Sequence, residues 1–471
     1  MTEPHYSDAT VTVHHGDCLD VLRTLPDASV DSVVTDPPYG LEFMGKEWDS
    51  FGGDNRQPFR GEIQTPDNPF GRSTVRYGGT SSLGKNHAAA MRAFQQWCEL
   101  WAAECLRVLK PGGHLLAFGG TRTWHRLACA VEDAGVEVRD SIAWLYGSGF
   151  PKSLDVSKAI DKAAGVEREV IRERYTVKRI KPGATVVAEG EWGKQDVPYT
   201  ATDTAPATPD AETWQGWGTA LKPAFEPVVV ARKPLVGTVA QNVLTHGTGA
   251  LNIDGCRVGQ PGTTREQIRP TGGDRTSMGQ MGEHTPFHYA PGSGGRWPAN
   301  VVLDETQADA LDEQSGESAS GKPGVVAYGA HEDTGRNRTY GAGLSSSTPN
   351  QPPKGNTGGA SRFFYIAKAD ASERPRVNGI AHPTVKPLAL MRWLVRLVTP
   401  PGGTVLEPFA GSGTTVEACI IEHFRCIAIE RGAEYLPLIE SRIARRRDPV
   451  RAIELAGEDM GLFDLDGEAT A

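Results

Sequence analysis

The sequence predicts an α/β protein whose core is a doubly wound, mostly parallel sheet interrupted by a long Pro/Gly-rich insertion. Three observations favour this fold class. Short apolar runs alternate with longer amphipathic stretches over residues 10–150, and the same alternation resumes after His382. Between these regions the composition shifts to Pro, Gly, Ser and Thr, which is typical of loops and conditionally ordered arms.

The N-terminal part reads as strands alternating with helices. We expect strands in ATVTVHHGD (residues 9–17), SVDSVVTDPP (29–38), HLLAFGG (114–120) and SIAWLY (141–146), and an amphipathic helix over residues 89–110 that ends at Pro-Gly-Gly. Such βαβ patterns indicate a parallel sheet. Inside the insertion, FEPVVVARKPL (225–235) predicts a strand that returns to the core beside residues 141–146.

The C-terminal part repeats this pattern. Residues 386–403 predict a helix with Pro387 near its start, and residues 404–430 predict a strand, a glycine turn, a helix and a second strand. The tail from residue 448 is acidic, and we expect it to be mobile.

Composition narrows the function classes. The chain has 471 residues, 38% of them hydrophobic, and a net charge of −9, so contact with a polyanion must come from a local basic face. The seven cysteines have no short paired spacing, which indicates reduced thiols and no metal site. No targeting or membrane segment is visible, so we expect a cytoplasmic protein.

A glycine turn and a later acid suggest a nucleoside site. Gly411 and Gly413 stand between a strand and a helix beginning near Thr414, and Glu430 ends the next strand, where it can accept hydrogen bonds from ribose hydroxyls. The turn lacks the third glycine of dinucleotide sites and the Gly-Lys-Ser/Thr of phosphate loops. A nucleoside carrying a positive sulfonium fits better, and an ordinary turn with a solvated acid is the alternative.

The segment DPPY follows a strand that we expect to be buried. Asp36 offers an acceptor, Pro37 and Pro38 hold a backbone carbonyl in the same direction, and Tyr39 presents an aromatic face. These groups suit an exocyclic amine on a base that has left the duplex, with direct transfer to the amine. A rigid turn at a strand end is the alternative interpretation.

No cysteine follows a proline, which disfavours methylation at C5 of cytosine, because that reaction uses an activated thiol, usually in a Pro-Cys pair.

With DPPYG at residues 36–40 and EPFAGSGTT at 407–415, the chain resembles the S-adenosylmethionine-dependent DNA amino-methyltransferases. The motif order resembles their permuted beta group, and the resemblance covers residues 10–150, 221–236 and 381–446. It implies a sheet of the class I methyltransferase type in permuted order. It also implies that residues 9–150 are the catalytic half of the core, 381–446 the cofactor-binding half and 447–471 an acidic tail. Residues 151–380 would be the target-recognition insertion, with 221–236 returning to the core.

The resemblance also implies roles for individual residues. Asp36, Pro37, Pro38 and Tyr39 look like the catalytic set. Asp17 and the backbone of Cys18 would contact the adenine of the cofactor, and Thr384 and Lys386 its methionine end. The remaining cofactor candidates are Glu407, Phe409, Gly411, Gly413, Thr414 and Glu430. A strand-to-helix turn at residues 16–19 and a simple helix entry at 382–387 are the alternatives.

DNA contacts are expected in two places. The segments after the DPPY motif and at residues 147–161 resemble flanks of a phage-type, stand-alone subgroup, which makes Lys46 and Lys152 candidates, although packed loops are the alternative. Residues 168–183 hold six basic and two acidic residues and could contact the DNA backbone. The candidates there are Arg172, Arg174, Lys178 and Arg179, with a solvated helix face as the alternative.

The sequence therefore predicts a site-specific methyltransferase that acts on an exocyclic amine of a flipped base in double-stranded DNA. N6 of adenine is favoured because the first motif residue is often Ser in the cytosine-N4 enzymes that the chain resembles. N4 of cytosine is the main alternative; an RNA or protein-amide methyltransferase and a non-catalytic DNA-binding specificity protein are weaker ones. A homodimer and a restriction endonuclease partner stay open.

Overall fold

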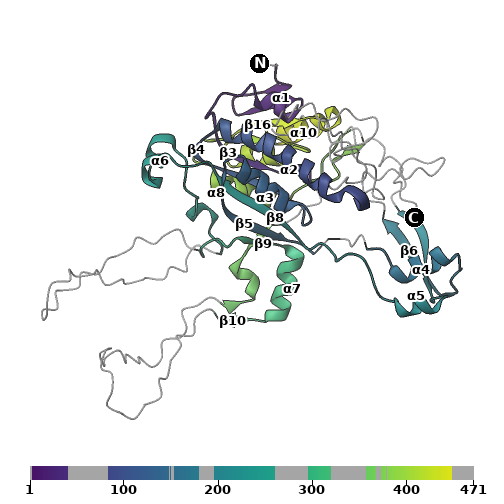
Figure 1. Cartoon of the computed structure of the whole chain (residues 1–471). Coiled ribbons are helices and arrows are strands. Elements are labelled where there is room, and N and C mark those ends of the chain that lie inside the picture. Colours follow the sequence, from purple (N-terminus) through teal and green to yellow (C-terminus); the bar gives the residue numbers. More distant parts are fainter. Residues whose placement is uncertain are drawn as a thin grey trace, which may run out of the picture.

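The computed structural model (Figure 1) describes residues 3–40, 83–147, 149, 153–179, 196–259, 295–319, 357–367, 373–377 and 379–447. Lys46, Lys152 and the acidic tail lie outside the described residues. No helix within the described ranges is both long and apolar enough to cross a bilayer.

A ten-stranded sheet forms the centre of the molecule (Figure 1), in the order β1-β2-β16-β15-β3-β4-β8-β5-β9-β12. The strands are β1 (Tyr6–Ser7), β2 (Val11–His15), β16 (Arg425–Glu430), β15 (Thr404–Glu407), β3 (Val30–Thr35), β4 (Leu109–Phe118), β8 (Phe225–Arg232), β5 (Glu137–Leu145), β9 (Val301–Asp304) and β12 (Tyr365–Ala367). The strands from β2 through β4 run parallel. β8 runs antiparallel to both of its neighbours. The α/β class and the mostly parallel sheet are confirmed.

Helices cover both faces of the sheet. Helices α1 (Cys18–Leu22), α2 (Leu83–Val108) and α3 (Trp124–Asp133) pack on one face, and α8 (Leu388–Val398), α9 (Thr414–Ile421) and α10 (Leu436–Arg447) pack on the other. Because successive strand residues point to opposite faces, Val33 packs in the core beneath α2 and Val34 in the core beneath α8. Every residue of β3 is buried, as expected for a central strand. The sheet is doubly wound.

The parallel strands end at one edge of the sheet, which brings the candidate site together. Glu430 at the end of β16 pairs in register with His15 on β2, and Glu407 at the end of β15 pairs with Ala428. Asp36 follows β3 directly. The four loops that carry the predicted site residues therefore meet at this carboxyl edge.

Strand β8 reaches the same edge from the opposite direction. It pairs with β5, as its predicted return to the core requires, and the register sets Glu226 opposite Trp144 and Val228 opposite Phe118. Because β8 is antiparallel, its first residues lie where the parallel strands end. Glu226 thus stands at the carboxyl edge.

The insertion contributes more regular structure than the sequence predicts. Strands β9 and β12 extend the main sheet beyond β5, with helix α7 (Glu305–Ser315) between them in the chain. For the basic segment at residues 168–183, the alternative of a solvated helix face is wrong. Residues Val170–Arg179 form strand β6, which pairs antiparallel with β7 (Asp196–Thr204). Helices α4 (Val156–Ala164) and α5 (Pro209–Thr213) accompany this hairpin, and Figure 1 shows the group set apart from the main sheet.

The remaining elements are short. They are α6 (Val239–His246), β10 (Ser318–Ala319), β11 (Thr357–Gly358), β13 (Arg376–Val377), β14 (Ile380–Ala381) and the 3-10 turns Asp254–Cys256, Ala360–Phe363 and Ala433–Tyr435.

Candidate active site

Four polar side chains contact one another at the end of β3, and we call them the acid–lysine cluster: Asp36, Tyr39, Glu226 and Lys386. The Tyr39 hydroxyl lies 2.8 Å from Asp36 Oδ1 and 3.0 Å from Glu226 Oε2. Lys386 Nζ lies 2.5 Å from Asp36 Oδ2 and 3.2 Å from Glu226 Oε2. Two carboxylates thus share one ammonium and one phenol.

Lys386 is the buried centre of this cluster. The residue is 8% exposed, and its Nζ lies 4.8 Å from the centroid of the Phe118 ring and 5.4 Å from that of Tyr39. Burial alone would lower the pKa of the ammonium, but the charges of Asp36 and Glu226 outweigh burial and raise the pKa above its ordinary value. The lysine is therefore charged, as a buried lysine with two acidic partners should be.

Tyr39 is held as a hydrogen-bond donor. Burial, followed by the charges of Asp36 and Glu226, raises the pKa of its phenol well above the ordinary value. The ring packs against the core cluster that contains α8. Pro37 is buried and Pro38 half-buried beside it. Gly40 has φ +68°, and a Cβ there would lie 2.7 Å from the Phe94 ring, so only glycine fits at the end of this loop.

The glycine turn between β15 and α9 requires its two glycines. Gly411 has φ +53° and Gly413 has φ +80°, a region that side chains rarely adopt. A Cβ on Gly413 would lie 3.1 Å from the backbone of Ile439. Gly413 is also the N-cap of α9 and no side chain caps that helix. Thr414 begins α9, with its Oγ1 3.3 Å from that of Ser412.

Glu430 faces the glycine turn. Its carboxylate accepts hydrogen bonds from Gly411 N at 2.7 Å and Gly432 N at 2.6 Å. Burial raises the pKa of this carboxyl to about 7, against the opposing effect of these backbone donors. Glu430 is thus fixed in direction and titrates close to neutral pH.

Glu407 is a buried residue that links the end of β3, before the DPPY loop, to the glycine turn. The residue is 2% exposed and accepts hydrogen bonds from Thr35 Oγ1, from Thr415 Oγ1 at 2.6 Å and from Phe409 N at 3.0 Å. Burial raises its pKa to about 8. With Gly411, Gly413 and Glu430 it forms what we call the glycine-turn edge.

Phe409 is an anchor of this turn. Its ring centroid lies 5.6 Å from those of both Trp97 and Trp101 on α2, so the start of the turn is fixed to the helical layer.

The loop after β2 lies beside Glu430. Gly16 N donates to the Glu430 carbonyl at 3.0 Å, and Asp17 Oδ1 accepts from Leu19 N at 3.0 Å, which caps α1. Cys18 is buried in the core and burial raises the pKa of its thiol, so the thiol itself is inert.

The segment from His382 to Lys386 connects both groups. His382 Nδ1 donates to the Thr384 carbonyl at 2.5 Å, and a Cβ on Gly411 would lie 3.2 Å from His382 Nε2. This segment therefore runs from the glycine turn to the acid–lysine cluster.

The structure brings the predicted catalytic and cofactor residues together at the carboxyl edge of the sheet and adds two that the sequence analysis missed. Glu226 gives no signal of its own in the sequence, because it is a single acid at the start of a strand. Thr35 has no feature that distinguishes it from the rest of its strand. The place of Glu226 at the carboxyl edge follows from the antiparallel pairing of β8, which the structure reveals.

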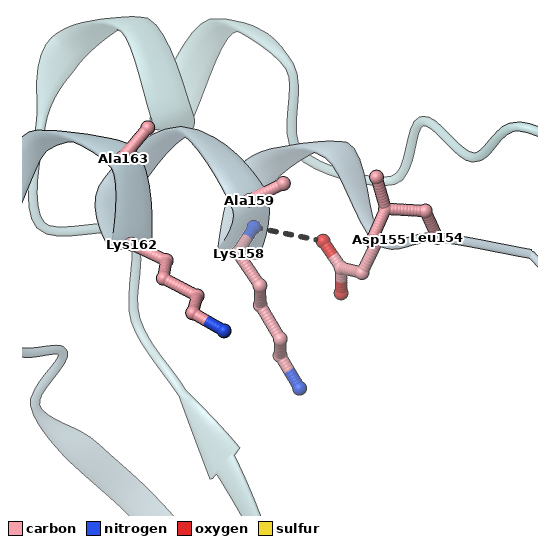
Figure 2. Close-up of a pocket in the computed structure, with 6 residues that line it drawn as sticks. All are labelled: Leu154, Asp155, Lys158, Ala159, Lys162 and Ala163. Atoms are coloured by element: carbon pink, nitrogen blue, oxygen red, sulfur yellow. Dashed lines mark hydrogen bonds between the residues drawn. The ribbon is translucent and has the colours of Figure 1, made fainter. Parts of the chain in front are cut away.

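The basic candidates lie elsewhere. Arg172 is exposed on β6, and Arg174, Lys178 and Arg179 belong to the same strand. A shallow hollow on the nearby helix α4 carries Lys158 and Lys162, and Figure 2 shows both side chains extending from the same side of the helix. Its other lining residues are Leu154, Asp155, Ala159 and Ala163.

The described residues hold no group of three or more His, Cys, Asp and Glu side chains that could bind a metal ion.

Comparison with curated proteins finds type II methyltransferases. The chain is 24% identical over 245 residues to the type II methyltransferase M.HindIII of Haemophilus influenzae, covering 51% of this chain and 64% of that protein. It is 23% identical over 150 residues to M.HinfI of Haemophilus influenzae, covering 31% of this chain and 34% of that protein. The matched segments thus span less than two thirds of either relative.

Similar solved structures include the PvuII DNA methyltransferase, described as cytosine-N4-specific, with 14% identity, a TM-score of 0.39 and coverage of 97% of this chain and 96% of that one. They also include an M1.HpyAVI–SAM complex, with 14% identity, a TM-score of 0.33 and coverage of 92% and 98%. At such scores the fold assignment rests on this chain's own strand order.

The family model described as DNA methylase, N6_N4_Mtase, matches residues 30–163 and 321–441, which is more than half of the chain. These ranges contain the DPPY loop, the glycine turn and Glu430. The chain belongs to the N6_N4_Mtase family of DNA methylases.

Proposed function

We propose that this protein is an S-adenosylmethionine-dependent, site-specific DNA methyltransferase that modifies N6 of adenine. The observation that carries the proposal is the position of Asp36 and Tyr39 at the same sheet edge as the glycine turn and Glu430, in a chain of the DNA methylase family.

The glycine-turn edge suits an adenosine group. Gly411 has no side chain. The Glu430 carboxylate is held in one direction by two backbone donors and has lone pairs left to accept hydrogen bonds from two ribose hydroxyls. Asp17 lies on the adjoining loop, where its second oxygen could accept from an adenine amino group. When bound, S-adenosylmethionine supplies a methyl group on a positively charged sulfur.

The acid–lysine cluster suits an exocyclic amine. Asp36 can accept a hydrogen bond from one amine hydrogen, and a backbone carbonyl of the Pro37–Pro38 turn can accept from the other. Transfer leaves positive charge on the amine nitrogen until a proton departs, and the Asp36 carboxylate stabilises that charge. Tyr39 stacks on the base, which must leave the duplex to reach this edge.

The choice of base rests on Asp36. Chains that this protein resembles often carry Ser at this position when they act on cytosine N4, so the carboxylate favours adenine. Both bases offer an amine with two hydrogens, and N4 of cytosine is therefore the second candidate.

Incubation of the purified protein with unmethylated genomic DNA and isotopically labelled S-adenosylmethionine tests the proposal. Nucleoside digestion followed by mass spectrometry should find the label in N6-methyldeoxyadenosine. Label in N4-methyldeoxycytidine would show that the target base is cytosine and not adenine. DNA without label would contradict the proposal.

We also propose that the part of the insertion holding α4, α5 and the β6–β7 hairpin contacts the DNA backbone. Support comes from the basic residues of β6 and from the exposed Lys158 and Lys162 on α4 (Figure 2).

Charge reversal of Arg172, Arg174 and Arg179 should weaken DNA binding and lower the slope of log Kd against log salt by about 0.9 for each phosphate that the variant no longer neutralises. Reversal of Arg139, an exposed arginine on β5, serves as the control. A triple variant that binds DNA like the wild type at every salt concentration would exclude this surface.

A further inference from the structure

The acid–lysine cluster contains a carboxylate that the proposed reaction does not use. Glu226 accepts from Tyr39 and pairs with Lys386, and its side chain is 20% exposed. It comes from β8, where it pairs with Trp144 on β5, and two residues later β8 also pairs with β4. Its position is therefore fixed by the core of the fold.

Lys386 creates an electrostatic conflict at Asp36. Its ammonium lies 2.5 Å from Asp36 Oδ2 and its side chain is 9% exposed, so solvent screens the pair poorly. If Lys386 were paired with Asp36 alone, its ammonium would neutralise the negative charge that stabilises the amine nitrogen as that nitrogen becomes positive. It would also repel that developing charge directly.

Glu226 resolves this conflict by charge balance. With both carboxylates ionised and Lys386 protonated, the cluster carries a net charge of −1 before transfer. Positive charge developing on the amine then brings the site towards neutrality. Without Glu226 the cluster would be neutral before transfer and positive during it, which a partly buried site resists.

We propose that Glu226 is a positioning residue that shares the ammonium of Lys386 and the hydroxyl of Tyr39 with Asp36, so that the cluster keeps a net negative charge and Asp36 can stabilise the positive charge on the target amine. This inference rests on the proposed methyl transfer, in which the amine nitrogen forms a bond to the methyl carbon, the bond from that carbon to sulfur breaks with its electron pair kept by sulfur, and one amine proton leaves to Asp36 or solvent.

Single-turnover methyl transfer to amplified, unmethylated genomic DNA tests this role. Glu226→Gln should lower the rate constant about 100-fold, because the interaction matters as charge develops. Affinities for S-adenosylmethionine and DNA should stay within about twofold of the wild type, the pattern of a loss confined to the transition state. Glu137→Gln, which removes an exposed acid paired with Arg232 on the same sheet, is the matched control and should keep the wild-type rate.

The double variant Glu226→Gln/Lys386→Met separates charge balance from a merely structural role. Removing the ammonium restores the net charge of −1, so the double variant should transfer methyl at least about tenfold faster than Glu226→Gln alone. A wild-type rate in Glu226→Gln, or a double variant no faster than the single one, would overturn the role of Glu226 and leave the proposed function intact. A wild-type protein without transfer would overturn both.

Discussion

The acid–lysine cluster and the glycine-turn edge hold their acidic side chains in different ways. Asp36 and Glu226 share the ammonium of Lys386 and the hydroxyl of Tyr39. Glu407 and Glu430 instead take hydrogen bonds from hydroxyls and backbone N–H groups, and burial raises their pKa values to about 8 and about 7.

The contrast shows how one sheet edge can serve two tasks. In the acid–lysine cluster two carboxylates share one ammonium, and this excess of negative charge suits a site that must stabilise positive charge. Neutral donors fix the direction of a carboxylate but compensate burial only in part, so that acid titrates near neutral pH. We expect mutations at the first region to change the rate of transfer and those at the second to change cofactor affinity and stability.

Removal of Asp36 should give the largest effect. Asp36→Ala should lower the single-turnover rate by about 1000-fold, because it removes the acceptor for the target amine. Its affinity for S-adenosylmethionine should change little, which isothermal calorimetry can measure. Retained transfer would remove Asp36 from the catalytic set.

Removal of an acid from the glycine-turn edge should weaken cofactor binding. Glu430→Ala should weaken S-adenosylmethionine binding by about 30-fold, since hydrogen bonds to a charged acceptor contribute about 1.5–3 kcal/mol. An unchanged dissociation constant in the same calorimetric experiment would count against contact with the ribose. Glu434→Ala, an exposed acid in the following turn, is the control.

The pKa of Glu430 makes cofactor affinity depend on pH. Only the ionised carboxyl can accept from both hydroxyls, so affinity should be nearly full at pH 8 and above and fall about tenfold between pH 8 and pH 6. Titration of Glu430→Gln should give a flatter profile. Equal pH profiles in the two proteins would show that another group is responsible.

The smallest effect should come from Glu407, through stability. Its pKa in the folded protein, about 8, lies above the ordinary value of 4.5, so its contribution to stability is full below pH 4.5 and is lost as pH rises through about 8. Glu407→Gln cannot titrate there. Its unfolding midpoint should therefore fall about 3 °C less between pH 5 and pH 8 than that of the wild type.

The surface variant Glu132→Gln provides the comparison for this measurement, because Glu132 is exposed on α3. If the unfolding midpoints of the wild type, Glu132→Gln and Glu407→Gln all fall by the same amount between pH 5 and pH 8, Glu407 is not the group that titrates.

The central strands and the glycine turn could be predicted because each has a local signal. Three features can be recognised without any knowledge of the fold. They are the apolar run before Asp36, the spacing of Gly411 and Gly413, and the acid that ends β16. Parallel pairing then brings their ends together.

What the sequence analysis missed depends on contacts between distant residues. The role of Lys386 at the cofactor's methionine end stays a prediction, but its contact with Asp36, 350 positions earlier in the chain, could not be foreseen from the sequence. Glu226 has meaning only through the register of β8. Strands β9 and β12 have four and three residues, too few for a periodic pattern to be recognised.

Sequencing DNA from a host that expresses the protein, with a method that distinguishes N6-methyladenine from N4-methylcytosine, tests the central claim most directly. We expect N6-methyladenine at one recurring sequence, and no such methylation in cells expressing Asp36→Ala. DNA that carries neither base above the level of the untransformed host, with the protein present and folded, would contradict it.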